Sequence, residues 1–150
     1  MKKSEDFYDQ ALKKLEKFNL NKANLKEAFF LLKKADKAGD HRATYAIGTW
    51  YLHGRYVEVD IDKAFGLITI AAKKNHPSAL YDLAIFYEKG VSVRKNAKKA
   101  YRLYLSAALR QDKQSFYEVG RCLFYGIGVQ ADKALANIWL DRARELDVIE

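Results

Sequence analysis

The chain has 150 residues, of which 49% are hydrophobic, 31% are charged and one is a cysteine. This length and composition suit a folded domain with a continuous core and exclude a disordered chain. A single cysteine excludes an intrachain disulfide framework and fits a reducing compartment, so we expect the protein to be cytoplasmic. No run approaches the ~18 apolar residues of a membrane span. The opening MKKSEDFYDQ also lacks the apolar segment of a signal peptide.

The net charge is +8 and the isoelectric point is near 9.4, which favours acidic partners, nucleic acid or anionic membrane surfaces. Lysine pairs are dispersed along the chain, for example at Lys33 and Lys34 and at Lys98 and Lys99. Dispersed charge is typical of a solvated surface. The charge by itself therefore does not select one class of partner.

The sequence repeats itself with a period of 36 residues and without gaps. Identical residues superimpose after this shift, among them Tyr45, Tyr81 and Tyr117, then Gly54, Gly90 and Gly126, and in four copies Ala28, Ala64, Ala100 and Ala136. Self-similarity at such a period indicates a repeat architecture. We therefore predict one domain over residues 1–150, with units at residues 5–40, 41–76, 77–112 and 113–148.

The first unit is the least regular of the four. Its first helix is expected over residues 4–18, with Leu12 and Phe18 at positions where later units have glycine or alanine. Terminal repeats are atypical because one of their faces meets water. Its second helix is expected over residues 25–38, with Asn24 as the N-cap.

Each later unit is predicted to form two helices joined by a short loop. Apolar residues spaced by three or four indicate a first helix over residues 42–53. Gly54 should end it, because a residue without Cβ can take the left-handed conformation of a helix C-terminus. Pro77 is expected in the first turn of the next helix, where its missing amide proton costs nothing.

The second helices are predicted over residues 61–74, 97–110 and 133–146. Their expected N-caps share one column of the repeat, namely Asp60, Asn96 and Asp132. Each helix carries alanine, a large apolar pair and alanine on one face, which lets neighbouring helices approach closely. Few residues follow Leu146, so we expect the apolar last helix pair to be a docking edge or a homodimer contact.

The recurring columns resemble the Sel-one-like repeat (SLR), a branch of the tetratricopeptide-type helical solenoids with the approximate motif LGxxYxxGxGVxxDxxKAxxWxxKAA. The second unit carries the resemblance through Ile47, Gly48, Tyr51, Gly54, Val57, Asp60, Lys63, Ala64, Ala71 and Ala72. Tyr56 and Ser92 stand where the motif has its second loop glycine. The resemblance implies an all-α, right-handed α-solenoid of about four helix-turn-helix repeats, whose first helices line a concave face. It also implies a non-catalytic adaptor or scaffold without a cofactor.

If the first helices line a groove, their side chains that the core does not need are candidates for partner contacts. These are Arg42, Tyr45, Thr49, His53, Tyr81, Ile85, Lys89, Tyr117, Arg121, Phe124 and Tyr125, accompanied by Leu52, Ser78, Glu88 and Gln114. The recurring tyrosine offers a large and rigid contact area, although packing between repeats would explain it equally well. Four cations would give the groove a basic rim for a carboxylate or phosphate, namely Arg42, His53, Lys89 and Arg121. An ordinary solvated surface is the alternative.

The sequence predicts neither a catalytic nor a metal site. Ser92 and Lys95 satisfy an SxxK motif, but its supporting elements are missing. The three histidines lack ligand spacing with one another or with Cys122, which aligns with Trp50 and Phe86 and is expected in the core.

The leading hypothesis is a non-catalytic scaffold that binds a protein or peptide. The alternative is a basic scaffold that binds nucleic acid or another polyanion. Helical solenoids that read RNA need regular polar positions, and Thr49, Ile85 and Arg121 in one column are not a regular code.

Overall fold

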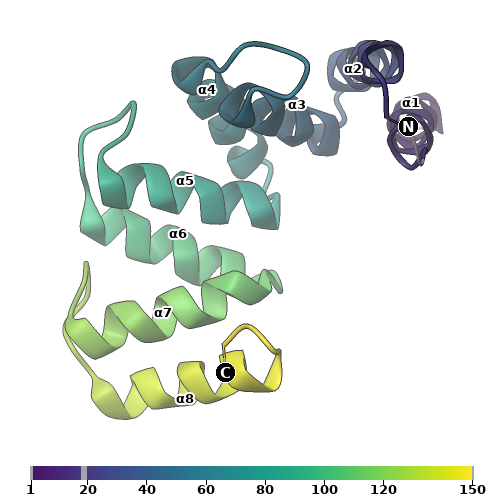
Figure 1. Ribbon diagram of the computed structural model, residues 1–150. Helices are drawn as coiled ribbons and strands as arrows, with labels where there is room; N and C mark the ends of the chain where they lie inside the picture. The colour runs from purple at the N-terminus through teal and green to yellow at the C-terminus, as the bar shows by residue number, and fades with distance from the viewer. Residues whose placement is uncertain (1, 18–19, 150) are drawn as a thin grey trace. The chain divides into compact units, whose positions relative to one another are not determined.

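The computed structural model describes residues 2–17 and 20–149, and every regular element within them is an α-helix (Figure 1). The eight helices of this part of the chain are α1 (Lys2–Leu15), α2 (Lys22–Lys37), α3 (His41–His53), α4 (Ile61–Lys73), α5 (Pro77–Lys89), α6 (Ala97–Leu109), α7 (Lys113–Tyr125) and α8 (Lys133–Glu145). The first helices α3, α5 and α7 start 36 residues apart, and so do α4, α6 and α8. The predicted all-α fold with helix-turn-helix repeats of this period is confirmed.

The chain divides into two compact units, Met1–Lys74 (unit 1) and Asn75–Glu150 (unit 2). In unit 1, α1 packs against α2, α2 against α3, and α3 against α4. Unit 2 repeats this order, with α5 against α6, α6 against α7, and α7 against α8, and Figure 1 shows these four helices stacked in chain order. Each unit therefore contains two helix pairs.

The predicted helix boundaries of the later repeats are confirmed at both ends. Asp60, Asn96 and Asp132 cap α4, α6 and α8, because their side chains accept the backbone N–H three residues on, at 3.0, 3.0 and 2.9 Å. The C-caps of α3, α5 and α7 are left-handed, with φ of 69°, 69° and 71° at Gly54, Gly90 and Gly126. Pro77 is the first residue of α5.

The predicted cap of the first repeat is wrong. Asn21 caps α2 and accepts the backbone N–H of Asn24 at 2.9 Å, so Asn24 lies inside the helix. A competent capping side chain one turn earlier lets this helix start at Lys22 and reach 16 residues, against 13 in α4. Helix α1 ends at Leu15, and Phe18 lies outside the described residues.

Two loops keep the repeat conformation without its glycine. Tyr56 and Ser92 have φ of 63° and 56°, close to the 69° of Gly128 at the same position in the fourth repeat. The left-handed region is unfavourable for residues with a Cβ, by roughly 1–2 kcal/mol. The surrounding caps and packing therefore determine this turn more strongly than its residue type does.

Two alanine columns are buried in both units. Ala28, Ala64, Ala100 and Ala136 are at most 1% exposed, as are Ala35, Ala71, Ala107 and Ala143. The predicted burial of Cys122 is also confirmed, at 1% exposure, and its aligned residues Trp50 and Phe86 are 4% and 5% exposed. These small and buried side chains fix the positions of the first helices, whose remaining residues are available for a site.

Candidate functional site

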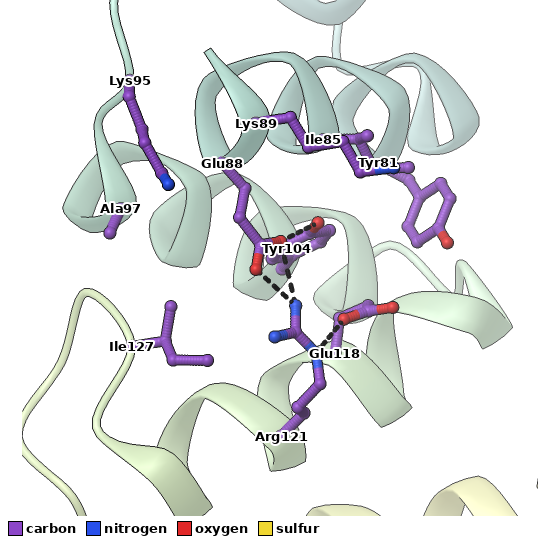
Figure 2. A pocket seen from close by; sticks show the side chains of 10 residues that line it. All are labelled: Tyr81, Ile85, Glu88, Lys89, Lys95, Ala97, Tyr104, Glu118, Arg121 and Ile127. Carbon is purple, nitrogen blue, oxygen red and sulfur yellow. Dashed lines mark hydrogen bonds and ion pairs between the residues drawn. The ribbon is translucent and has the colours of Figure 1, made fainter.

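An open hollow of about 790 Å³ lies between α5, the start of α6 and α7 in unit 2, and we call it the α5–α7 groove. Its lining side chains are drawn in Figure 2 and are Tyr81, Ile85, Glu88, Lys89, Lys95, Ala97, Tyr104, Glu118, Arg121 and Ile127. Five of them, Tyr81, Ile85, Glu88, Lys89 and Arg121, were predicted from the sequence as partner contacts. The groove combines apolar walls with a charged floor.

The floor is a network of four side chains centred on Arg121. Its Nη2 donates to both carboxylate oxygens of Glu88, at 2.8 and 2.9 Å, and its Nε donates to Oε2 of Glu118 at 2.7 Å. The hydroxyl of Tyr104 donates to Oε2 of Glu88 at 2.7 Å. Figure 2 shows these bonds converging from three helices, since Glu88 lies on α5, Tyr104 on α6 and Arg121 on α7. The network therefore ties both helix pairs of unit 2 together.

The network holds its charges in fixed states. Burial acts to raise the pKa of Glu88, but hydrogen bonds from Tyr104 and Arg121 and the charge of Arg121 outweigh it and lower the pKa. Burial and the hydrogen bond to Glu88 raise the pKa of Tyr104. Burial acts to lower the pKa of Arg121, but hydrogen bonds to Glu88 and Glu118 raise it. None of these groups is poised to exchange a proton near neutral pH, so the network suits support and not proton transfer.

The groove still offers hydrogen-bond donors to a ligand. Nη1 of Arg121 donates to no described residue, and Figure 2 shows it facing the open side of the groove, between Glu88 and Ile127. Lys89 and Lys95 are exposed at the rim. Ile85 and Ile127 are half-buried and supply apolar surface. This arrangement fits an extended segment that presents carbonyl or carboxylate oxygens beside an apolar side chain.

A second, smaller hollow shares Arg121 with the groove. It has a volume of about 150 Å³ and is lined by Tyr117, Arg121, Phe124, Tyr125 and Leu140. The rings of Phe124 and Tyr125 meet edge to face with centroids 5.0 Å apart, and Tyr125 is 71% exposed. Eight of the ten contact residues predicted in unit 2 thus line one of two adjoining hollows, whereas Ser78 and Gln114 line neither.

The five contact residues predicted in unit 1, Leu52 among them, lie on α3. Arg42 binds the carboxylate of Asp40 through Nε at 3.0 Å and Nη2 at 2.7 Å, and its guanidinium lies 4.3 Å from the centre of the Tyr8 ring. The hydroxyl of Thr49 donates to the backbone oxygen of Ala46 at 2.7 Å. Tyr45 is half-buried and His53 is exposed. Of the expected basic rim, Arg42 and Arg121 therefore already bind carboxylates of their own chain.

The sequence profile described as the Sel1 repeat matches residues 20–40, 41–76, 77–112 and 117–148. The chain belongs to the Sel1 repeat family. Proteins built of Sel1 repeats are generally protein-interaction scaffolds, and the family is typically non-catalytic. None of the curated proteins compared with the chain matches it.

Solved structures of other Sel1 repeat proteins share the α-solenoid fold. The protein c5321, a protective antigen in uropathogenic Escherichia coli strains, has a TM-score of 0.86 at 24% identity, over 95% of this chain and 30% of that one. A Sel1 repeat protein from Oxalobacter formigenes has a TM-score of 0.70 at 34% identity, over 79% and 34%. Helicobacter pylori cysteine rich protein B has a TM-score of 0.63 at 23% identity, over 85% and 92%. The chain thus spans about a third of the length of the first two proteins.

Two members of the network centred on Arg121 were not predicted from the sequence. Tyr104 occupies the large apolar column of the second helices and was assigned to the core, where its ring is indeed 1% exposed. Glu118 was not singled out, because its aligned residues Gln10, Ala46 and Asp82 do not form a recurring column. An acidic residue three positions before an arginine on one helix was the one available signal.

Over residues 2–17 and 20–149, no helix is both long and apolar enough to cross a membrane. In the same part of the chain, no group of three or more His, Cys, Asp or Glu side chains is arranged to hold a metal ion.

Proposed function

We propose that this Sel1 repeat protein is a non-catalytic scaffold or adaptor that binds a protein or peptide in the α5–α7 groove. The observation that supports the proposal most strongly is that eight of the ten predicted contact residues of unit 2 line the groove or the smaller hollow beside it. Most of these residues differ between repeats, so the repeat does not require them. The exceptions are the recurring Tyr81 and Tyr117 and the network residue Arg121. A rigid floor beneath variable walls suits selective binding, because less order is lost when the partner docks.

The groove and the smaller hollow beside it also have the composition of a protein-binding surface. Tyr125 is an exposed aromatic side chain, and exposed aromatic residues contribute strongly to protein interfaces. Lys89 adds a cation at the rim without a role in the network. A partner segment would place an apolar side chain against Ile85 and an oxygen acceptor near Nη1 of Arg121.

Affinity capture from the native host, followed by titration of the partner it identifies, tests this function. Lys89→Glu changes the rim of the groove and Tyr125→Ala changes the smaller hollow beside it, and neither removes a member of the network. Lys13→Glu changes an exposed lysine of α1 as a control. We expect Tyr125→Ala to weaken binding by about 2 kcal/mol, or roughly 30-fold, with the control unchanged. A partner bound equally well by all three variants would contradict the assignment of the groove.

A further inference from the structure

The positive charge of the chain is concentrated in one stretch. Residues 89–110 hold seven basic residues and no Asp or Glu, namely Lys89, Arg94, Lys95, Lys98, Lys99, Arg102 and Arg110. The whole chain has 27 basic and 19 acidic residues. Without these seven, the rest of the chain has 20 basic and 19 acidic residues. The net charge of +8 is therefore almost entirely the charge of this stretch, and the pattern of dispersed lysine pairs concealed it.

The repeat accounts for Lys99, which aligns with Lys63, but not for the rest of this charge. The aligned stretch of the second repeat, residues 53–74, has four basic and three acidic residues, and that of the fourth, residues 125–146, has three of each. The first repeat has six basic and two acidic residues over 17–38. An acid-free stretch is thus a property of the third repeat and not of the fold.

Three of these cations surround another hollow, which lies on α6 and is distinct from the two described above. Lys98, Lys99 and Arg102, which we call the basic patch, line a hollow of about 560 Å³ together with Asn96, Leu103 and Ser106. All three cations are exposed, and none forms an ion pair with any described residue. Lys99 lies with Nζ 4.3 Å from the centre of the Tyr87 ring, which positions the ammonium group without neutralising it.

Helix stability does not explain the basic patch either. Lys98 and Lys99 lie in the first turn of α6, which has no acidic residue there, whereas α4 has Asp62. The helix macrodipole is positive at this end, so lysines there are unfavourable and carboxylates favourable. An anion bound at the patch would interact favourably with the positive end of the helix macrodipole and would reduce the repulsion between the cations.

The surroundings of the patch favour an acidic polypeptide over a nucleic acid. Leu109 is 65% exposed and lies 11 residues after Lys98, so both project from one face of α6 about 16 Å apart. Single-stranded nucleic acid is usually held by exposed aromatic rings, but no ring lines this hollow and that of Tyr87 is covered by Lys99. A peptide can supply both carboxylates and an apolar side chain for Leu109. We infer that the basic patch binds an acidic segment of a partner protein, separately from the α5–α7 groove.

Fluorescence anisotropy with a labelled peptide of glutamates around one leucine tests this inference, in about 0.1 M salt. The patch variant carries Lys98→Glu, Lys99→Glu and Arg102→Glu. The matched control carries Lys13→Glu, Lys26→Glu and Lys37→Glu, three exposed lysines whose reversal lowers the net charge equally. We expect the patch variant to weaken binding at least about tenfold and the control less than about twofold.

Two further measurements keep the outcome decisive. The neutral variant Lys98→Gln, Lys99→Gln and Arg102→Gln should weaken binding in the same direction with unchanged circular dichroism, and Tyr125→Ala should leave it unchanged, which separates the patch from the proposed groove. Equal losses in the patch variant and the control would overturn the inference, because net charge alone would then explain binding. No binding by the native chain, or patch-dependent binding of a uridine oligonucleotide or of anionic vesicles tighter than that of the peptide, would overturn it too.

Discussion

Glu88 is the residue on which the floor of the groove depends, because it accepts from two other helices at once. Its carboxylate binds Arg121 and Tyr104 and its side chain is 22% exposed. If Glu88 lost its charge, Glu118 would be the one carboxylate of the network still paired with Arg121. Replacing one carboxylate oxygen of Glu88 with an amide nitrogen should therefore weaken the network that forms the floor of the groove.

We expect Glu88→Gln to lower the free energy of unfolding by about 1.5–3 kcal/mol near neutral pH, since hydrogen bonds to a charged group are replaced by neutral ones. The folded pKa of Glu88 lies below the reference value of 4.5. The carboxylate therefore stabilises the fold fully above about pH 4.5 and loses this contribution as the pH falls through the lower folded pKa. Urea denaturation at several pH values should show the difference from the native chain shrinking in acid. Glu58→Gln, at an exposed loop position, is the control; a difference independent of pH would contradict this assignment.

The loop between α7 and α8 passes so close to the start of α6 that one of its positions must be glycine. Gly128 has φ of 69°, and a Cβ built on it would lie 2.0 Å from the backbone oxygen of Ala97 and 2.4 Å from its carbonyl carbon. Neither backbone atom can move without shifting the start of α6. Gly126, in the same loop, has φ of 71° but would place its Cβ 3.4 Å from the nearest atom, the Cβ of Ala131.

Gly128→Ala should therefore destabilise the fold by about 2–5 kcal/mol, combining left-handed strain with a backbone clash. Gly126→Ala should cost only about 1–2 kcal/mol, because it adds the strain without the clash. Thermal unfolding of the two variants, followed by circular dichroism, measures the difference. Equal costs would mean that the loop moves away from Ala97 without penalty.

The helices could be predicted from sequence wherever local chemistry and the repeat agree. Asp60, Asn96 and Asp132 are competent caps at one column of the repeat, and each caps its helix. The prediction was wrong at Asn24 because Asn21, which stands where the later repeats have valine, is an equally good cap that comes earlier. Repeat symmetry carries little information where a terminal unit departs from it.

The candidate site could be predicted less completely, because periodicity gives the face of a helix but not its partners. The predicted residues Tyr81, Ile85 and Lys89 of α5 do line the α5–α7 groove. Arg121 was expected as a donor for a ligand, yet most of its donors are taken by Glu88 and Glu118. Glu88 is 33 residues away in sequence, and only the packing of both helices around α6 brings the two together.

At the scale of the whole molecule, each compact unit has a core of its own. The core of unit 2 draws on all four of its helices, with Ala84 from α5, Tyr104 from α6, Cys122 from α7 and Ala136 from α8. A separate core, with Phe29, Ile47 and Trp50 among its buried residues, serves unit 1. Because no helix of unit 2 encloses its core alone, reaching Cys122 requires several helices to separate.

Cys122 therefore provides a built-in reporter of this separation. It is 1% exposed, and burial raises the pKa of its thiol to about 11. The thiolate is the reactive form, so both burial and the raised pKa suppress its reaction at about pH 8. We expect maleimide to label the native chain slowly, and labelling to accelerate with urea in step with the loss of helical circular dichroism. Gly128→Ala should speed native labelling more than Gly126→Ala, since it destabilises the unit more. Rapid labelling of the native chain that urea does not accelerate would show that α7 exposes Cys122 by local motion alone.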